Sequence, residues 1–356
     1  MSYTEVLTEH GVTVEIWNEG IFEEYLGQVF WAMMMGESDG AVIQLHDDLQ
    51  KQAGDAITLQ LRSQVKGGHV TGASQGVGNE GEMEFYARRI TVDNDRQLVK
   101  MKNVKMSKQR VNFSILQSAR AGLVDKARFQ LEDDITTRLV DTTEGRVRGR
   151  YLYGAADSNW NAVHATALQA VDNTDDKLTT TMIDIAKRKA MIPVNAITKI
   201  RPMKVKSMSM SGAEEWFVFV AHPFSIRDMI INDASWKNAQ LNIPPLANRQ
   251  SPLYTGSAFK GSWNGVLIYE WDRVALETST IQVSHNLLLG AQAGAVVWAQ
   301  RSVFGEEMQD VGHNRIFELH EIRGVDKVVF NVNAIDGSKS NEDHGVVHVL
   351  AAALND

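Results

Sequence analysis

An apolar position that recurs between residues 111 and 139 is the feature that most constrains this fold. Apolar side chains occupy every fourth residue there: Val111, Ile115, Ala119, Leu123, Ala127, Leu131, Ile135 and Leu139. This spacing predicts an amphipathic helix over about 107–140, with Ser107 as its N-cap. A helix of roughly 30 residues is about 45 Å long. A four-residue step also turns by about 40° per repeat, so the apolar stripe winds around the helix and its two ends must pack on different elements.

Two alternating segments flank a glycine-rich stretch earlier in the chain. Residues 56–62 and 83–92 alternate between apolar and polar side chains, which predicts two half-buried strands. Residues 67–82, between them, contain few apolar side chains and six glycines: Gly67, Gly68, Gly72, Gly76, Gly78 and Gly81. So little apolar surface cannot form a core. We therefore expect these glycines to form the tip of a long two-stranded arm.

Part of this stretch has the glycine spacing of a dinucleotide-binding loop. Gly76, Gly78 and Gly81 fit the pattern G-x-G-x-x-G. Such a loop must join a buried strand to a helix, whereas residues 82–85 alternate like a strand. Three glutamates also lie close to where phosphates would bind. The stretch is therefore interpreted as architectural, and no cofactor is expected.

The remainder of the chain mixes helices and strands without regular alternation. An amphipathic helix is expected within 12–35. Further helices are expected at 177–192 and 226–240, and strands at 216–223, 265–271, 316–332 and 345–354; 284–302 is compatible with either a helix or a strand. This order predicts an α+β fold.

Charge is distributed unevenly along the chain, whose net charge is −8. Residues 1–50 contain ten acidic and no basic residues, whereas residues 85–110 contain eight basic and two acidic ones. One interpretation is that both segments are solvated faces. The sharper interpretation is that they attract each other, within one subunit or between subunits. The candidate interface residues are Glu15, Glu19, Glu23, Glu24, Arg88, Arg89, Lys100, Lys102, Lys105 and Lys108. An N-terminal segment without basic residues does not resemble a secretory signal.

No motif in the sequence indicates catalysis. The absence of cysteine excludes disulfides, thiolate metal sites and cysteine nucleophiles. His344 and His348 have the spacing of helical metal ligands, but their surroundings read as a strand and no third ligand is evident, so we expect no metal. Arg146, Arg148 and Arg150 alternate with other residues and predict one cationic face. This face could meet phosphates or a neighbour's acids, and the acids are the favoured alternative.

The order of these segments resembles that of tailed-phage major capsid proteins with the Hong Kong 97-type fold. An acidic N-terminal arm is followed by a glycine-tipped β-arm, a very long helix and a compact α/β region. The amino-acid sequences of four segments are similar to those of the N-four-type major capsid protein family. These segments are 76–97, 221–240, 251–271 and 313–331. These segments are structural motifs rather than catalytic ones, so they indicate a family but not a reaction.

The resemblance implies a division of the chain into four parts. These are an N-arm over 1–53, an E-loop over 54–105, a peripheral P-domain over 106–175 and 313–356 with the long helix as its spine, and an axial A-domain over 176–312. In such an arrangement the glycine-rich tip adapts to unequal neighbours around pentamers and hexamers.

The resemblance also implies a function. The chain is expected to self-assemble into pentamers and hexamers of an icosahedral head shell, in the host cytoplasm, and to remain in the virion. The expected partners are copies of itself, separate scaffolding and portal proteins, decoration proteins, and double-stranded DNA held without sequence-specific contacts; no membrane is involved. The alternative is the shell of a cellular nanocompartment, which shares the fold and encloses cargo enzymes.

Overall fold

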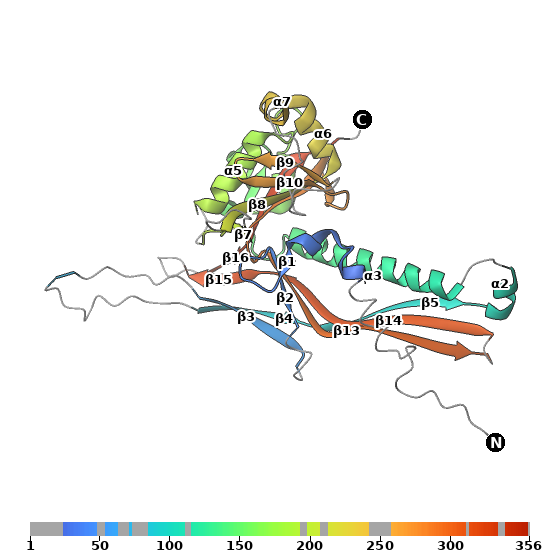
Figure 1. Ribbon diagram of the computed structural model, residues 1–356. Coiled ribbons are helices and arrows are strands. Elements are labelled where there is room, and N and C mark those ends of the chain that lie inside the picture. Colours follow the sequence, from blue (N-terminus) through green and yellow to red (C-terminus); the bar gives the residue numbers. More distant parts are fainter. Residues whose placement is uncertain are drawn as a thin grey trace, which may run out of the picture. The chain divides into compact units, whose positions relative to one another are not determined.

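The computed structural model describes residues 24–47, 54–62, 71–72, 85–110, 115–192, 198–206, 213–241, 258–310, 313–333 and 339–354 (Figure 1). The chain forms two compact units. The first comprises Met1–Asp55, Thr91–Arg138 and Gly294–Asp326, and the second comprises Ala56–Ile90, Leu139–Ala293 and Lys327–Asp356. Each unit combines helices with a sheet, which confirms the predicted α+β class.

The first unit contains a five-stranded sheet in the order β1-β2-β13-β14-β5. Its strands are β1 (Met35–Gly36), β2 (Ile43–His46), β13 (Gly294–Gln309), β14 (Asn314–Lys327) and β5 (Asp93–Met101). Strand β14 is antiparallel to β5 along its length, from Arg315 opposite Met101 to Arg323 opposite Asp93. Two of the strands are therefore much longer than ordinary ones and form an extended ribbon.

The long helix lies alongside this sheet (Figure 1). It is α3 (Ile115–Val140), and a short helix, α2 (Val104–Arg110), precedes it. The apolar stripe is confirmed, because its described members are buried: Ala119, Leu123, Ala127, Leu131, Ile135 and Leu139. The N-cap assigned to Ser107 is wrong. Ser107 lies inside α2, and its amide donates to the carbonyl of Asn103, whose left-handed backbone (φ 49°) marks the helix start.

The helix predicted within 12–35 is described only from residue 24 onward. Residues 24–26 are helical, a 3-10 helix follows at Phe30–Met34, and residues 12–23 lie outside the described part of the chain. Tyr25, Trp31 and Met34 are nevertheless buried. This segment is therefore anchored in the first unit by its large side chains.

The second unit is built on an eight-stranded sheet in the order β6-β17-β12-β8-β10-β9, with β11 paired to β12 and β7 to β8. The strands are β6 (Tyr151–Tyr153), β7 (Met203–Lys206), β8 (Ala213–Ala221), β9 (Phe259–Trp263), β10 (Val266–Glu270), β11 (Leu276–Thr278), β12 (Gln282–Leu289) and β17 (Val346–Ala352). The ambiguous segment 284–302 thus belongs to two strands, β12 and β13. In β12 seven consecutive residues are buried, because the strand is covered on both faces.

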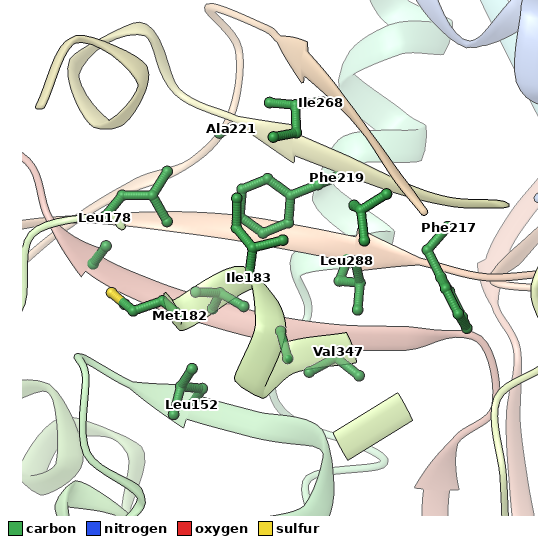
Figure 2. Close-up of a cluster of buried hydrophobic side chains, with 14 of the residues drawn as sticks. Leu152, Leu178, Met182, Ile183, Phe217, Phe219, Ala221, Ile268, Leu288 and Val347 are labelled. Carbon is green, nitrogen blue, oxygen red and sulfur yellow. The ribbon is translucent and has the colours of Figure 1, made fainter. Parts of the chain in front are cut away.

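One face of this sheet packs on helix α5 (Thr180–Met191). Figure 2 shows Met182 and Ile183 of α5 among side chains from the strands, including Phe219, Leu288 and Val347. All five side chains are fully buried. The opposite face packs on helix α4 (His164–Gln169) and carries a more aromatic cluster that includes Tyr151 and Tyr153 of β6.

The single helix predicted at 226–240 is two helices, α6 (Pro223–Asn232) and α7 (Ala234–Leu241). Asp233 separates them. One of its carboxylate oxygens accepts hydrogen bonds from the backbone amides of Ser235 and Trp236, and the other accepts from the amide and hydroxyl of Thr180. Asp233 thereby caps both α7 and α5, because it satisfies amides at both helix starts.

The two predicted arm strands are confirmed. β3 (Ala56–Arg62) and β4 (Phe85–Thr91) pair in a two-stranded sheet. At the tip the structure describes only residues 71–72, where Gly72 is exposed and has a left-handed backbone (φ +67°). The other five tip glycines lie outside the described residues. A second two-stranded sheet consists of β15 (Val329–Asn333) and β16 (Lys339–Asp343).

Strand pairing also joins segments that the resemblance assigns to different domains. β6 and β17 come from the segments expected for the P-domain, yet β17 pairs with β6 on one side and with β12 on the other. They complete the same sheet as β8 and β10, from the segment expected for the A-domain. The apolar face of β17 requires this position, because all seven of its residues are buried.

Candidate assembly interface

Glu24 is the described member of the four candidate acidic residues. Its carboxylate lies 3.0 Å from the guanidinium of Arg120 on α3, and both side chains are partly exposed. An exposed ion pair of this kind contributes about 0–1 kcal/mol. The partner of Glu24 within its own unit is thus a base outside the segment 85–110. Glu15, Glu19 and Glu23 lie outside the described part of the chain.

The basic candidates have different environments. Arg88 lies 2.7 Å from the carboxylate of Glu144 in the same unit, and Arg89 is exposed. Lys100 and Lys102 are exposed, and within the described residues neither has an ion pair. Lys105 and Lys108 lie on α2.

Lys100 belongs to an exposed row at the edge of the first unit's sheet. β5 is the last strand in the sheet order, and Leu98, Lys100 and Lys102 alternate along and just beyond it. Leu98 is also exposed. Lysines at a sheet edge commonly prevent unwanted strand pairing. The row can therefore either protect this edge or offer charge to a neighbouring subunit.

The cationic face predicted from Arg146, Arg148 and Arg150 is wrong. The 3-10 helix η3 (Arg148–Arg150) interrupts the strand alternation, so the three side chains point to different partners. The side chain of Arg150 is 0 % exposed, and its guanidinium bonds to Thr198 and lies 3.8 Å from the carboxylate of Glu342. Burial lowers the pKa of Arg150, and Glu342 opposes that shift.

The other two arginines also have partners within the second unit. Arg148 lies 3.0 Å from Asp157. The guanidinium of Arg146 lies 4.4 Å from the ring centroid of Trp160 and donates a 2.8 Å hydrogen bond to the hydroxyl of Tyr153. All three arginines are therefore engaged inside the subunit.

His348 lies on β17 as a strand residue, as predicted, and is fully buried. In the part of the chain that the structure describes, no group of three or more metal-binding side chains has the geometry to hold an ion. Sequence reasoning missed a second histidine, His285 of β12, whose Nε2 lies 2.7 Å from Nδ1 of His348. The available signal was a histidine within each of two strand segments that are rich in apolar residues.

A comparison with protein-family models decides which family the chain belongs to. Residues 6–354 match the family described as "Phage capsid protein". The chain belongs to this family. It is thus a phage capsid protein that forms the head shell of the virion and is not an enzyme. This assignment favours the phage shell over the nanocompartment.

Solved structures show that the capsid protein has the expected Hong Kong 97-type fold. The capsid of cyanophage Pam1 matches with a TM-score of 0.73 and 23% identity, over 100% of this chain and 97% of that chain. The capsid of Ralstonia phage GP4 matches with a TM-score of 0.74 and 21% identity, over 92% of each chain. The head of Helicobacter pylori bacteriophage KHP40 matches with a TM-score of 0.67 and 12% identity, over 99% of this chain and 95% of that chain. A search of curated proteins found no match.

Among the described helices of the capsid protein, none is both long and apolar enough to cross a membrane.

Proposed function

We propose that this capsid protein is of the N-four type and assembles into pentamers and hexamers of an icosahedral shell around double-stranded DNA. The observation that supports this proposal most directly is the arm formed by β3 and β4. Its inner residues Leu59 and Ile90 are buried, whereas Phe85 is 68 % exposed. A two-stranded sheet is only marginally stable by itself. The arm therefore gains stability when it packs on a neighbouring subunit.

The proposed domains follow the family pattern with one adjustment. The N-arm covers 1–53, the E-loop 54–105, the P-domain 106–175 and 313–356, and the A-domain 176–312. Because β6 and β17 pair within the sheet that holds β8, β10 and β12, we place these two strands with the A-domain sheet. The spine of the P-domain is then α3, with β14 beside it.

Electrostatic attraction between subunits is the proposed role of the charged segments. Lys100 and Lys102 of one subunit attract the acidic N-arm of the next, where Glu15, Glu19 and Glu23 are concentrated. Arg88, Arg89, Lys105 and Lys108 extend the basic side, although Arg88 also has a partner in its own unit. Single exposed pairs are weak, so the effect depends on their repetition around the shell.

The capsid protein acts with further components in this proposal. Scaffolding and portal proteins, encoded separately, direct closure, and decoration proteins bind the finished shell. The chain carries a net charge of −8, so it does not neutralise nucleic acid in bulk, and DNA is packaged without sequence-specific contacts.

Charge reversal tests the electrostatic part. We expect Lys100→Glu combined with Lys102→Glu to give folded, soluble capsomers that rarely close into shells in electron micrographs. Lys126→Glu is the matched control, because Lys126 is also exposed and lies in the same unit, on α3. Equal yields of closed shells from both proteins would contradict the proposed role of the lysines.

Truncation tests the N-arm separately. The deletion should end before residue 24, because Tyr25 and Trp31 are buried and their loss would unfold the first unit. Removing residues 1–20 should leave capsomers that do not close. Normal shells from the truncated chain would rule out an essential N-arm.

A further inference from the structure

A continuous line of ionisable side chains crosses the aromatic face of the second unit. Oε1 of Glu277 on β11 lies 2.5 Å from Nδ1 of His285 on β12. Nε2 of His285 lies 2.7 Å from Nδ1 of His348 on β17, and Nε2 of His348 lies 3.1 Å from Oδ2 of Asp343. Both histidines are 0 % exposed. Two imidazoles thus bridge two carboxylates without access to water.

These distances require a definite number of protons. Each of the three contacts joins two atoms that carry lone pairs, so each needs one hydrogen between them. With both carboxylates ionised, the two rings must supply all three hydrogens. Two neutral imidazoles carry only two ring protons. One contact therefore stays unfilled, which means that no hydrogen lies between its two atoms, unless the pair binds a third proton.

The unfilled contact is the one between His348 and Asp343, since it is the longest of the three. In the two-proton form Nδ1–H of His285 donates to Glu277, and Nδ1–H of His348 donates to Nε2 of His285. The lone pair of His348 Nε2 then faces Asp343 Oδ2. A third proton on this nitrogen converts that repulsion into a charge-assisted hydrogen bond.

A third histidine on the same face provides the contrast. His164 of α4 donates from Nε2 to Glu277 over 2.7 Å and can accept at Nδ1 from the hydroxyl of Tyr153 over 2.8 Å. The Tyr153 oxygen in turn accepts from Arg146. Every contact of this branch is complete with a neutral imidazole. The unfilled position is therefore particular to His285 and His348.

We propose that His285 and His348 form a buried one-proton site: the pair exchanges a single proton as one unit, and the hydrogen bond from His348 to Asp343 forms only when that proton is bound. A fourth ring proton has no place, because two N–H groups would then face each other across the 2.7 Å contact between the rings.

Charge balance favours filling the site, and burial opposes it. The ammonium of Lys327 lies 2.7 Å from Oδ1 of Asp343, so Glu277, Asp343 and Lys327 together carry −1, which the third proton neutralises. Desolvation lowers the pKa of His285 and lowers the pKa of His348 to about 3, with the carboxylates opposing the shift. The site therefore fills in acid, below the ordinary histidine range near 6.5.

Further ionisable groups lie near the pair. They are Tyr151, which stacks on His348 at 4.2 Å, then Tyr153, Arg146, His164 and Asp141, and Arg150, which interacts with Asp343. Burial raises the pKa of Tyr151 well above its usual value. Tyr151 therefore does not supply the missing proton.

The site makes the core of the subunit sensitive to acid. Unfolded histidines take up protons near pH 6.5, whereas the folded pair does so only at lower pH. The free energy of unfolding consequently falls as pH drops between these two values, since the unfolded chain binds more protons. The His348–Asp343 bond limits this loss once the site fills.

Nitrogen-15 magic-angle-spinning NMR of assembled shells tests the proposal on the intact protein. A cross-peak between ring nitrogens of two histidines identifies the pair, because these atoms lie 2.7 Å apart. At neutral pH we expect both rings of the pair as Nδ1–H tautomers. On acidification the pair should gain one proton in a single step. A gain of two protons, no gain before unfolding, or an unprotonated His285 Nδ1 at neutral pH would overturn it.

The variant Asp343→Asn provides an independent readout. Its amide can donate the hydrogen that the third proton otherwise supplies, while its carbonyl oxygen can stay beside the ammonium of Lys327. We expect the acid step to disappear in this variant and to persist in His164→Gln, which alters the branch that is already complete. An unchanged acid step in Asp343→Asn would contradict the proposal, and failure of that variant to fold leaves the wild-type spectra decisive.

Discussion

The guanidinium of Arg323 on β14 lies 2.6 Å from the carboxylate of Asp134 on α3. The same group lies 2.7 Å from Asp95 on β5 and 3.5 Å from the buried carboxylate of Glu321. Arg323 itself is buried. One cation therefore joins the long helix to two paired strands, and the first unit depends on it for charge balance.

Replacement of this cation should destabilise the first unit strongly. Arg323→Met keeps most of the apolar volume but leaves Glu321 buried without its partner, and removing one partner of a buried pair costs about 3–5 kcal/mol. The loss should be visible as an earlier transition in denaturant unfolding of unassembled chains. Arg301→Met is the control, because its pair with Asp47 is half exposed and is worth about 0–1 kcal/mol. Similar losses in both variants would contradict this account of Arg323.

Gly345, in the turn before β17, should not tolerate a side chain. A Cβ atom there would lie 2.5 Å from the backbone Cα and nitrogen of Ala293. Backbone atoms cannot move aside cheaply, so we expect Gly345→Ala to cost about 1–3 kcal/mol in thermal or denaturant unfolding. Gly122 on α3 has no atom within 4 Å of such a Cβ, and Gly122→Ala should stabilise by up to about 1 kcal/mol. The prediction fails if the two alanines act in the same direction.

His344 should contribute to acid sensitivity independently of the histidine pair. Burial, with Arg201 and Arg150 nearby, lowers the pKa of His344 to about 3. The unfolded histidine protonates near pH 6.5, so stability that is present above that pH is lost as the pH falls toward 3. His344→Phe removes the titrating group and can keep the edge contact with Phe330. The drop in Tm between pH 7 and pH 5 should therefore shrink in this variant but not in His313→Phe, which alters an exposed histidine.

The glycine-rich tip should become protected only on assembly. Residues 67–82 contain six glycines and little apolar surface, too little to offset about 1–2 kcal/mol of backbone entropy per residue in a free subunit. Hydrogen exchange should be fast at the tip in unassembled chains and slow in shells. Protection of the tip in free subunits would show that it does not need a neighbour.

Alanine substitution adds a functional test of the same tip. Gly76→Ala, Gly78→Ala and Gly81→Ala together should leave the folded cores intact and reduce the yield of closed shells, because any left-handed position would be strained. Gly72, with its φ of +67°, shows that such a position occurs at the tip. The measurement is the fraction of closed particles by electron microscopy.

Local periodicity by itself determined the main elements of this protein. The four-residue apolar step predicted α3, and alternation predicted β3 and β4, because burial of one face constrains helices and strands through neighbours that are close in sequence. The charge asymmetry of residues 1–50 and 85–110 was also visible directly. The pairing of these charges between subunits stays a prediction.

Contacts between distant residues were decided only by the tertiary structure. Asp233 divides a predicted helix because Thr180, far away in the sequence, supplies donors to it. Arg150 leaves its expected cationic face because Glu342 lies close to it inside the second unit. His285 and His348 meet because β12 and β17 pair antiparallel. Sequence patterns record which residues are apolar, whereas the partner of a buried polar group depends on how distant segments pack. That is why the contacts of these four residues escaped prediction.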